Sequence, residues 1–255
     1  MILLLDIGNT NTHIGLANNR RVVRQSDIST ASWQGGNAKP LLRRFVRTAR
    51  LEGVAVCSVV PRVVSEVRRV VAEVWSLPCL CLTPERVWRL GIDYPKPKKI
   101  GTDRLANALA AKTHFGAPVL VVDFGTAVTF DVVDARGKYV GGIIAPGLAA
   151  MTDYLHEKTA LLPRIKIHDE VSAIGKSTEH AMRVGAVHGY RGLVRELIGE
   201  LKRELKARRL PVVATGGYAE LMARNVREIT AVNPQLTLEG LRLMWEDNHP
   251  RRAHI

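Results

Sequence analysis

The sequence predicts an α/β protein made of two similar domains, each built on a mixed sheet. Three observations lead to this prediction. An apolar run that ends in an Asp-x-Gly turn occurs twice, at residues 2–8 and 119–125, and a repeat at nearly half the chain length is too long for a solenoid. After each copy, helical and strand-like stretches follow one another. Hydrophobic residues make up 46% of the 255-residue chain, which is enough to give each half a core.

The first copy begins with an apolar strand at 2–5 that stops at Asp6. A short polar turn leads into a second apolar strand at 12–17, so the pair is expected to form a β-hairpin with its apex at Gly8. Periodicity and helix-breaking residues then predict the remaining elements of this half. They are helices at 40–50, 62–74 and 103–115, the last capped by Thr102, and strands at 53–60 and 79–82.

The second copy begins with an apolar strand at 119–122 that stops at Asp123. A strand at 129–134 follows, and the next strand is expected to meet Gly141-Gly142 and then a loop at Pro146-Gly147. Helices are predicted at 177–206, 217–225 and 236–246, with a short strand at 211–214. This division places the domains at 1–115 and 116–255, and it leaves open whether the last helix packs back on the first domain.

Composition narrows the class of partner. A net charge of +13 is compatible with nucleic acid, an anionic membrane or a small anionic ligand. Lys and Arg are spread along the chain and aromatic residues are only 5%, so a surface for stacking bases is poorly supplied and no nucleic-acid partner is expected. No apolar run approaches the roughly 18 residues of a membrane-spanning helix, and the N-terminus has no basic leader. We therefore expect a cytoplasmic protein with no membrane partner.

The three cysteines do not form a recognisable metal or redox motif. Cys57, Cys79 and Cys81 all lie in apolar, strand-like segments, and a Cys-x-Cys spacing suits neither a zinc knuckle nor a redox pair. We interpret them as buried thiols in a reducing compartment.

The paired turns carry the chemistry. A nucleoside triphosphate needs backbone and hydroxyl donors for its oxygens and a carboxylate that holds magnesium or its waters. One Asp-Gly hairpin tip is usually only a turn, but two tips at the separation of a domain favour a phosphate-binding role. The first tip supplies Asp6, Asn9, Thr10 and Thr12, and the second supplies Asp123, Gly125, Thr126 and Thr129.

The sequence resembles the type III pantothenate kinases over nearly its whole length. The segments that carry the resemblance are LDIGNTNT at 5–12, YPKPKKIGTDR at 94–104, VVDFGTAVTFD at 121–131, GGIIAPGL at 141–148, GKST at 175–178, VVATGGYAEL at 212–221 and NPQLTLEGL at 233–241. Two positions depart from the family pattern: Val128, which is expected to face the core, and Asn233, where the family more often has aspartate.

The resemblance implies two ribonuclease H-like domains of the actin, sugar-kinase and heat-shock-chaperone ATPase superfamily, with a cleft between them. It implies ATP-dependent phosphorylation of pantothenate, the first step of coenzyme A synthesis, by a homodimer. ATP would be bound by Asp6, Ile7, Gly8, Asn9, Thr10, Asn11, Thr12, His13 and Thr126. Asp6 would hold magnesium, and Asp123 would bind potassium or ammonium. Gly216-Gly217 resembles the adenosine loop of the superfamily, although a strand-Gly-Gly-helix connection is also ordinary.

Asp103 is the candidate catalytic base by the same resemblance. It lies at a helix N-terminus, which would stabilise the ionised carboxylate and make it a weak base; the alternative is an ordinary aspartate of a first helical turn. Pantothenate would be contacted by Tyr94, Gly101, Thr102, Asp103 and Arg104, and by Thr178 reaching across from the neighbouring subunit.

Each substrate residue has a competing structural role. Arg104 suits a substrate carboxylate but also a salt bridge to Asp103 or Asp93. Tyr94 lies in a proline-rich loop and is either a binding or a packing aromatic, and Thr178 is also suited to cap the helix from 179.

Two other functions stay open from the sequence. The protein could be a nucleotide-binding regulatory accessory factor, although Asp6 and Asp103 are both present. It could also be a kinase for another small hydroxy acid, because one fold serves many substrates.

Overall fold

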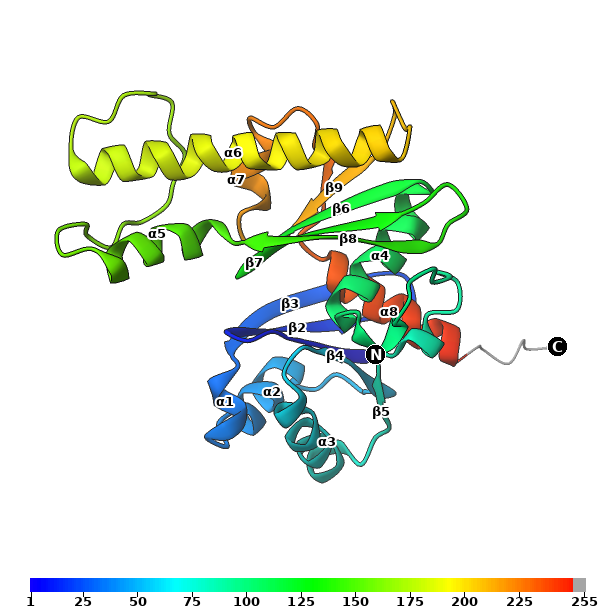
Figure 1. Cartoon of the computed structure of the whole chain (residues 1–255). Helices are drawn as coiled ribbons and strands as arrows, with labels where there is room; N and C mark the ends of the chain where they lie inside the picture. Colours follow the sequence, from blue (N-terminus) through cyan, green and yellow to red (C-terminus); the bar gives the residue numbers. More distant parts are fainter. Residues whose placement is uncertain (250–255) are drawn as a thin grey trace. The chain divides into compact units, whose positions relative to one another are not determined.

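The computed structural model describes residues 1–249, which form two compact units (Figure 1). Unit 1 is Met1–His114 together with the segment that starts at Gln235, and unit 2 is Phe115–Pro234. Each unit has one five-stranded sheet with helices packed on it.

The sheet of unit 1 has the strand order β3-β2-β1-β4-β5. The central strand β1 (Ile2–Ile7) pairs antiparallel with β2 and parallel with β4, so the predicted hairpin is confirmed. Its residues from Ile2 to Leu5 are almost completely buried, which is the environment that a continuous apolar run requires. The other strands are β2 (Asn11–Ala17), β3 (Val22–Ser29), β4 (Gly53–Ser58) and β5 (Cys79–Cys81).

The sheet of unit 2 repeats this arrangement with the order β10-β9-β6-β7-β8. Central strand β6 (Val119–Phe124) is antiparallel to β7 and parallel to β9, as β1 is to β2 and β4. The repeated sequence pattern therefore corresponds to a repeated mixed sheet, and the predicted α/β class is confirmed. The other strands are β7 (Ala127–Val133), β8 (Tyr139–Pro146), β9 (Val212–Thr215) and β10 (Ala231–Val232).

The helices of unit 1 include the last one of the described chain. They are α1 (Ala31–Gln34), α2 (Ala38–Val46), α3 (Pro61–Trp75), α4 (Thr102–Phe115, whose last residue is assigned to unit 2) and α8 (Leu236–Asn248), with short 3-10 turns at Pro84–Arg86 and Pro97–Lys99. Glycines allow α8 to approach closely: a Cβ at Gly53 would lie 1.9 Å from the Trp245 ring, and one at Gly240 would lie 2.1 Å from the Ala106 carbonyl oxygen. The final helix thus packs within unit 1.

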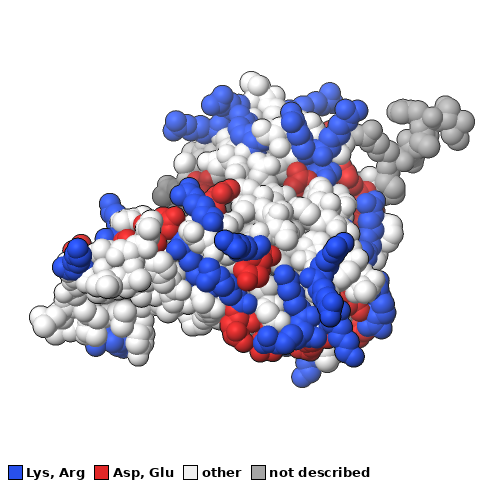
Figure 2. Space-filling model, turned by 90° about the horizontal axis from the view of Figure 1, so that it is seen from above, with Lys and Arg blue, Asp and Glu red and all other residues white. Residues whose placement is uncertain are grey.

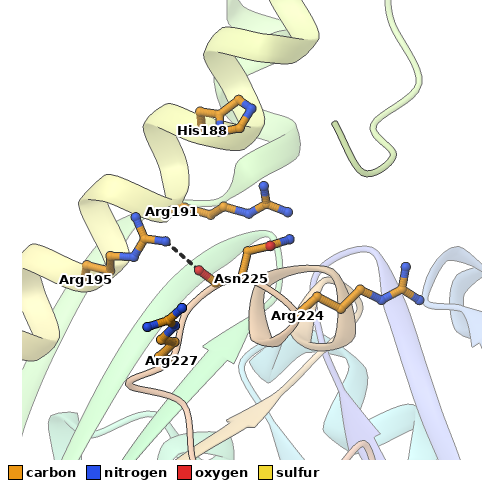
Figure 3. A pocket seen from close by; sticks show the side chains of 6 residues that line it. All are labelled: His188, Arg191, Arg195, Arg224, Asn225 and Arg227. Carbon is orange, nitrogen blue, oxygen red and sulfur yellow. Dashed lines mark hydrogen bonds between the residues drawn. The ribbon is translucent and has the colours of Figure 1, made fainter. Parts of the chain in front are cut away.

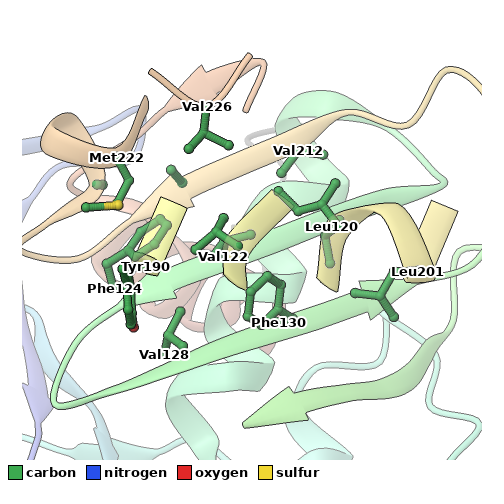
Figure 4. Packing of buried hydrophobic residues seen from close by; sticks show 14 of the residues in the cluster. Leu120, Val122, Phe124, Val128, Phe130, Tyr190, Leu201, Val212, Met222 and Val226 are labelled. Atoms are coloured by element: carbon green, nitrogen blue, oxygen red, sulfur yellow. The ribbon is translucent and has the colours of Figure 1, made fainter. Parts of the chain in front are cut away.

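The helices of unit 2 are α5 (Leu148–Lys158), α6 (Thr178–Glu204) and α7 (Ala219–Ala223). One face of α6 contributes Tyr190 and Leu201 to a core that also contains Phe124, Phe130 and Met222 (Figure 4). Val128 is fully buried in this core, as predicted.

Some local predictions differ from the structure. The predicted strand through Gly141-Gly142 is confirmed, but β8 also includes Pro146, which was expected in a loop, because its antiparallel register with β7 reaches Ala127. Helix α5 was not predicted, since its exposed apolar residues give no clear helical pattern. Thr102 is the first helical residue and no cap, because its hydroxyl bonds to Ser58. No helix among the described residues is both long and apolar enough to cross a membrane.

Candidate functional site

A row of polar side chains crosses the sheet of unit 1 at the end of β1. Asp6 is directly opposite His13 on β2 and Cys57 on β4, and His13 is opposite Asp27 on β3. Residues directly opposite one another share a face of the sheet. The Cys57 thiol donates to Asp6 Oδ1 at 3.2 Å, and His13 Nδ1 lies 2.6 Å from Asp27 Oδ1. The register of three strands thus fixes the surroundings of Asp6.

The hairpin turn beside Asp6 presents its polar residues to solvent. Gly8 N donates to the Asn11 carbonyl oxygen at 3.0 Å, which closes the turn. A Cβ at Gly8 would lie 3.0 Å from the same oxygen, so a larger residue would open the turn. Asn9, Thr10 and Asn11 are exposed. Their amide and hydroxyl groups are therefore accessible to an anionic ligand.

Two residues assigned to ATP from the sequence are buried. Thr12 is fully buried, and its hydroxyl accepts from Trp33 Nε1 at 3.0 Å and shares a hydrogen bond with the Thr30 hydroxyl. Thr30 in turn donates to the Gly8 carbonyl oxygen at 2.8 Å. Thr12 therefore supports the turn from behind through this chain of hydroxyls. The Ile7 side chain is likewise in the core, so only its main chain is available to a ligand.

Asp103 is held at the start of α4 by a connection to β4. The Ser58 N–H donates to the Thr102 hydroxyl at 2.9 Å, and that hydroxyl lies 3.2 Å from the Ser58 carbonyl oxygen. The Asp103 carboxylate turns back toward the helix start: it accepts from Arg104 N at 2.8 Å, and a Cβ at Gly101 would lie 2.5 Å from its Oδ1. Gly101 thus provides the space that the carboxylate occupies.

The electrostatic environment of Asp103 differs from the expectation. Burial raises the pKa of Asp103 above its ordinary value, although the Arg104 N–H and the charge of its guanidinium act in the opposite direction. Contacts at the helix N-terminus lower the Asp103 pKa, but desolvation raises it by more. The carboxylate is therefore not the weaker base that was expected. A raised pKa brings a carboxylate closer to the basicity that suits proton transfer near neutral pH.

Cys57 lies near both Asp6 and Asp103. Burial raises the pKa of the Cys57 thiol, and the charges of both Asp6 and Asp103 raise it further. Both carboxylates are therefore near this thiol. The sequence had placed Cys57 only in the core, and Ser58 in no site. Their position at the end of a strand parallel to β1 was the available indication, because carboxyl ends of neighbouring parallel strands meet at one edge.

The remaining substrate candidates of unit 1 lie around α4. Arg104 is half-buried, and the charge of its guanidinium acts on Asp103. Tyr94 is 38% exposed and lies in the segment before the turn at Pro97–Lys99, so its ring is accessible.

Unit 2 has the corresponding row at the end of β6. Asp123 is opposite Thr129 on β7 and Thr215 on β9. The residue after Thr215 is Gly216, where φ is +86° and a Cβ would lie 2.5 Å from Asp123 Oδ1. The backbone at Gly216 can approach the carboxylate this closely only without a side chain. The sequence pattern did not single out Thr215 as a site residue, because a threonine at the end of an apolar strand is ordinary.

Gly147 packs against the turn that contains Thr126. Its N–H donates to the Thr126 carbonyl oxygen at 3.1 Å, and a Cβ there would lie 2.3 Å from that oxygen. The exposed turn residues Gly125 and Thr126 are thus held from behind by the start of α5, as Gly8 is held by Thr30 in unit 1. Both turns are braced and both leave their tips accessible.

Thr178 is the exposed first residue of α6. The predicted capping role belongs instead to Ser177, whose hydroxyl accepts from His180 N at 3.2 Å. The Thr178 side chain therefore does not cap this helix.

Within residues 1–249, no group of three or more His, Cys, Asp or Glu side chains is arranged to hold a metal ion. A magnesium ion that arrives with a nucleotide is bound mainly by phosphate oxygens and waters, with one or two carboxylates from the protein. Asp6, at the edge of an exposed turn, fits such a role.

The chain is similar to known proteins over most of its length. The sequence profile of the family described as "Type III pantothenate kinase" matches residues 2–200. A protein named type III pantothenate kinase from Akkermansia muciniphila is 45% identical over 241 residues, covering 94% of this chain and 96% of the relative. One of the same name from Methylacidiphilum infernorum is 42% identical, covering 96% and 88%.

Solved structures share the fold at low identity. A conserved putative Baf family transcriptional activator from Campylobacter jejuni superposes with a TM-score of 0.60 at 16% identity, covering 96% of this chain and 98% of that one. A putative N-acetylmannosamine kinase from Listeria monocytogenes superposes with a TM-score of 0.57 at 11% identity, covering 97% and 99%. At these identities the likeness concerns the fold, which is that of the actin-like ATPases and sugar kinases.

Proposed function

The chain belongs to the type III pantothenate kinase family, and on this premise we propose which of its residues carry the reaction. The reaction is the phosphorylation of pantothenate by ATP to 4'-phosphopantothenate, in the synthesis of coenzyme A, and it uses a divalent metal ion. The observation on which the proposal rests most is the position of Asp103. Its carboxylate is desolvated and is held at the start of a helix. Asp103 and Asp6 both lie near the Cys57 thiol.

Asp103 is the proposed general base. It orients the primary hydroxyl of pantothenate and accepts its proton as the oxygen attacks the γ-phosphorus of ATP. Phosphoryl transfer has a loose transition state, so the proton is accepted late and positioning matters more than base strength. The raised pKa of Asp103 favours acceptance of the proton, and its fixed place over Gly101 favours positioning of the hydroxyl. Arg104 and Tyr94 are proposed to bind the carboxylate and chain of pantothenate.

The exposed turns are proposed to contact the phosphates of ATP. In unit 1 this role falls to Gly8, Asn9, Thr10 and Asn11, with His13 beside them. In unit 2 it falls to Thr126. A divalent ion bound near Asp6 would neutralise charge that develops on the phosphate oxygens. Thr12 is assigned a supporting role because its hydroxyl is already engaged by Trp33 and Thr30.

Asp123 is proposed to bind a monovalent cation, potassium or ammonium. A carboxylate beside phosphates repels them unless a cation lies between them. Asp123 is directly opposite Thr129 and Thr215 in the sheet, and the Gly216 backbone packs close to its carboxylate. One carboxylate with neutral oxygen donors from these neighbours would suit a weakly held monovalent ion.

A homodimer is proposed from the surface between α5 and α6. A groove of about 750 Å³ there is lined mainly by apolar residues, including Met151, Leu155 and Met182, and Tyr154 on its edge is 61% exposed. Charged side chains are sparse on the end of unit 2 where these helices lie (Figure 2). Exposed apolar surface of this extent is typical of protein interfaces. Thr178 starts the helix that lines the groove, so a partner seated there would lie near Thr178.

A coupled assay of ADP release with pantothenate tests these roles. We expect Asp103→Asn to lower kcat by about 10²–10⁴-fold, the usual contribution of general-base catalysis. Asp123→Asn should lose the stimulation by potassium and keep residual turnover in its absence. Full activity of Asp103→Asn would refute the base assignment, and potassium stimulation that persists in Asp123→Asn would refute the cation site. Turnover of another hydroxy acid in preference to pantothenate would change the substrate.

A further inference from the structure

Unit 2 contains a hollow of about 460 Å³ that has no part in the proposed reaction. It lies between the middle of α6 and the segment after α7, and arginine is its commonest lining residue (Figure 3). We call it the arginine pocket. Its lining residues are His188, Arg191, Arg195, Arg224, Asn225 and Arg227.

The chain builds this pocket from two elements with regular spacing. His188, Arg191 and Arg195 are three and four residues apart on α6, so they lie along one face of the helix. Across from them, Val226 is fully buried in the core and anchors the segment that follows α7. Its neighbours Arg224 and Arg227 are therefore held at the surface beside the α6 face.

Arg191 forms the buried part of the pocket. It is only 3% exposed, and its Nη2 donates to Asp169 Oδ1 at 2.6 Å. Its Nε is also buried and, within the described chain, has no hydrogen-bond partner. Its Nη1 lies 3.5 Å from the Glu170 carbonyl oxygen. A buried donor without an acceptor is costly, so the Nε–H favours an acceptor bound beside it. Arg191 thus has one buried N–H group, at Nε, that lacks an acceptor within the described chain.

The other arginines add positive charge that little in the pocket compensates. Arg195 donates to the Asn225 main-chain oxygen, which holds its guanidinium beside the hollow without neutralising it. The hydrogen bond from Arg191 lowers the pKa of Asp169, and the charge of Arg224 lowers it too, so this carboxylate stays ionised and offsets one arginine. Among residues 1–249, neither Arg224 nor Arg227 has a carboxylate within ion-pair distance. Several like charges facing one hollow repel one another unless an anion is bound.

We propose that the arginine pocket binds a small anion with two or more phosphoryl groups, in addition to the substrates of the kinase reaction. Guanidinium groups match phosphate oxygens in two-point geometry, and several of them from two elements suit a diphosphate better than a single carboxylate. The volume lies within the usual range for small-molecule sites.

A small ligand is favoured over nucleic acid by the make-up of the pocket. No aromatic residue lines it, so nothing there would stack a base. Lys and Arg side chains are scattered over the wider face that carries α6, with acidic groups between them, and do not form one continuous stripe (Figure 2). Four arginines instead converge on the hollow.

Calorimetric titration with inorganic pyrophosphate tests the proposal on the full-length protein. The kinase site is first saturated with a non-hydrolysable ATP analogue, magnesium and pantothenate, so that heat reports only a second site. The test variant is Arg224→Gln/Arg227→Gln. The control, Arg208→Gln/Arg209→Gln, removes the same charge from two exposed arginines that do not line the pocket. Turnover with pantothenate is measured for all three proteins.

We expect one equivalent of pyrophosphate to bind the wild type, at least tenfold weaker binding by the pocket variant, and a change of less than twofold in the control. Turnover should be the same in all three. Absence of binding by the wild type, or equal weakening in both variants, would refute the pocket. Tighter binding of a single-stranded oligonucleotide, lost in the pocket variant and falling steeply with salt, would overturn the small-anion proposal in favour of nucleic acid. These outcomes are independent of the kinase assignment, which the turnover assay measures separately.

Discussion

Asp103 illustrates how burial sets the behaviour of a single carboxylate. Its folded pKa is raised, so between the ordinary aspartate pKa of about 4 and the raised value the native state binds more protons than the unfolded state. Stability from this group is therefore fully present below the unfolded pKa and falls as pH rises through the folded pKa. Only the ionised form accepts a proton, so activity should rise with pH through the same window.

Asp103→Asn is expected to remove both effects. Its activity should no longer rise with pH in that window, and at neutral pH its free energy of unfolding should equal or exceed that of the wild type. Urea unfolding and pH–rate profiles measure the two quantities. Asp134→Asn is the control with the opposite sign: burial raises the Asp134 pKa, but hydrogen bonds from Lys138 and Arg136 outweigh it and lower the pKa overall. Lower stability of Asp103→Asn than of Asp134→Asn at neutral pH would contradict this account.

Gly101 should control the position of the Asp103 carboxylate. A methyl group there would lie 2.5 Å from Asp103 Oδ1, so Gly101→Ala must displace the carboxylate from the start of α4. We expect kcat to fall at least tenfold with little change in the melting temperature. Gly189→Ala on α6 is the control, because a Cβ there meets nothing within 4 Å. It should keep full activity and gain up to about 1 kcal/mol of stability from helix propensity. Unchanged kcat in Gly101→Ala would show that the carboxylate position is not critical.

The cysteines differ from the uniform burial expected of them. Only Cys57 is buried, whereas Cys79 and Cys81 on β5 are half-buried. The hydrogen bond from Cys79, together with Arg68 Nη2 at 3.3 Å, lowers the pKa of Cys81 to about 5, while burial and two carboxylates raise that of Cys57. Iodoacetamide at pH 6 should therefore alkylate Cys81 at least about tenfold faster than Cys57, as followed by peptide mass spectrometry. Comparable labelling rates would be inconsistent with these environments.

At the scale of elements, the hairpin turn of unit 1 is supported by the buried hydrogen bonds of Thr12 and Thr30. Thr12→Val keeps the shape of the side chain but leaves the buried Trp33 Nε1 without an acceptor and removes the donor to the Thr30 hydroxyl oxygen. The expected cost is about 1–3 kcal/mol of unfolding free energy, with weaker ATP binding because the turn loosens. Thr10→Val should instead weaken ATP binding without a loss of stability, since Thr10 is exposed. Urea unfolding and nucleotide titration separate the two, and a fully stable Thr12→Val would disprove the bracing role.

The hairpins were predictable because sequence and register coincide there. An apolar run that stops at Asp6 or Asp123 and turns at glycine specifies strand, apex and return strand locally. The support behind each turn was not predictable in the same way. Thr30 and Gly147 reach Gly8 and Thr126 from segments about 20 residues away, and no local pattern announces such contacts. Cys57 reaches Asp6 only through the parallel pairing of β1 with β4.

At the scale of the whole molecule, the duplicated pattern was the most informative part of the sequence. Both sheets have the same strand order relative to their central strand, so the internal repeat predicted the architecture of both units. Net charge was less informative, because +13 does not say where the charge gathers. The arginine pocket combines residues 188–195 with 224–227, and only the fold brings these segments together.

Association of two chains is the last property that the surface predicts. The groove between α5 and α6 leaves Met151 and Leu155 partly exposed among uncharged neighbours, and covering them with a partner removes apolar area from water. Leu155→Glu would place a charge in that contact, so we expect a dimeric wild type and a monomeric variant in light scattering at micromolar concentration. If Thr178 serves the site of its neighbour, the variant should also lose turnover with pantothenate. Val23→Glu, at an exposed apolar position of unit 1, should stay dimeric and active. A wild type that is monomeric under these conditions would remove both the dimer and the shared role of Thr178.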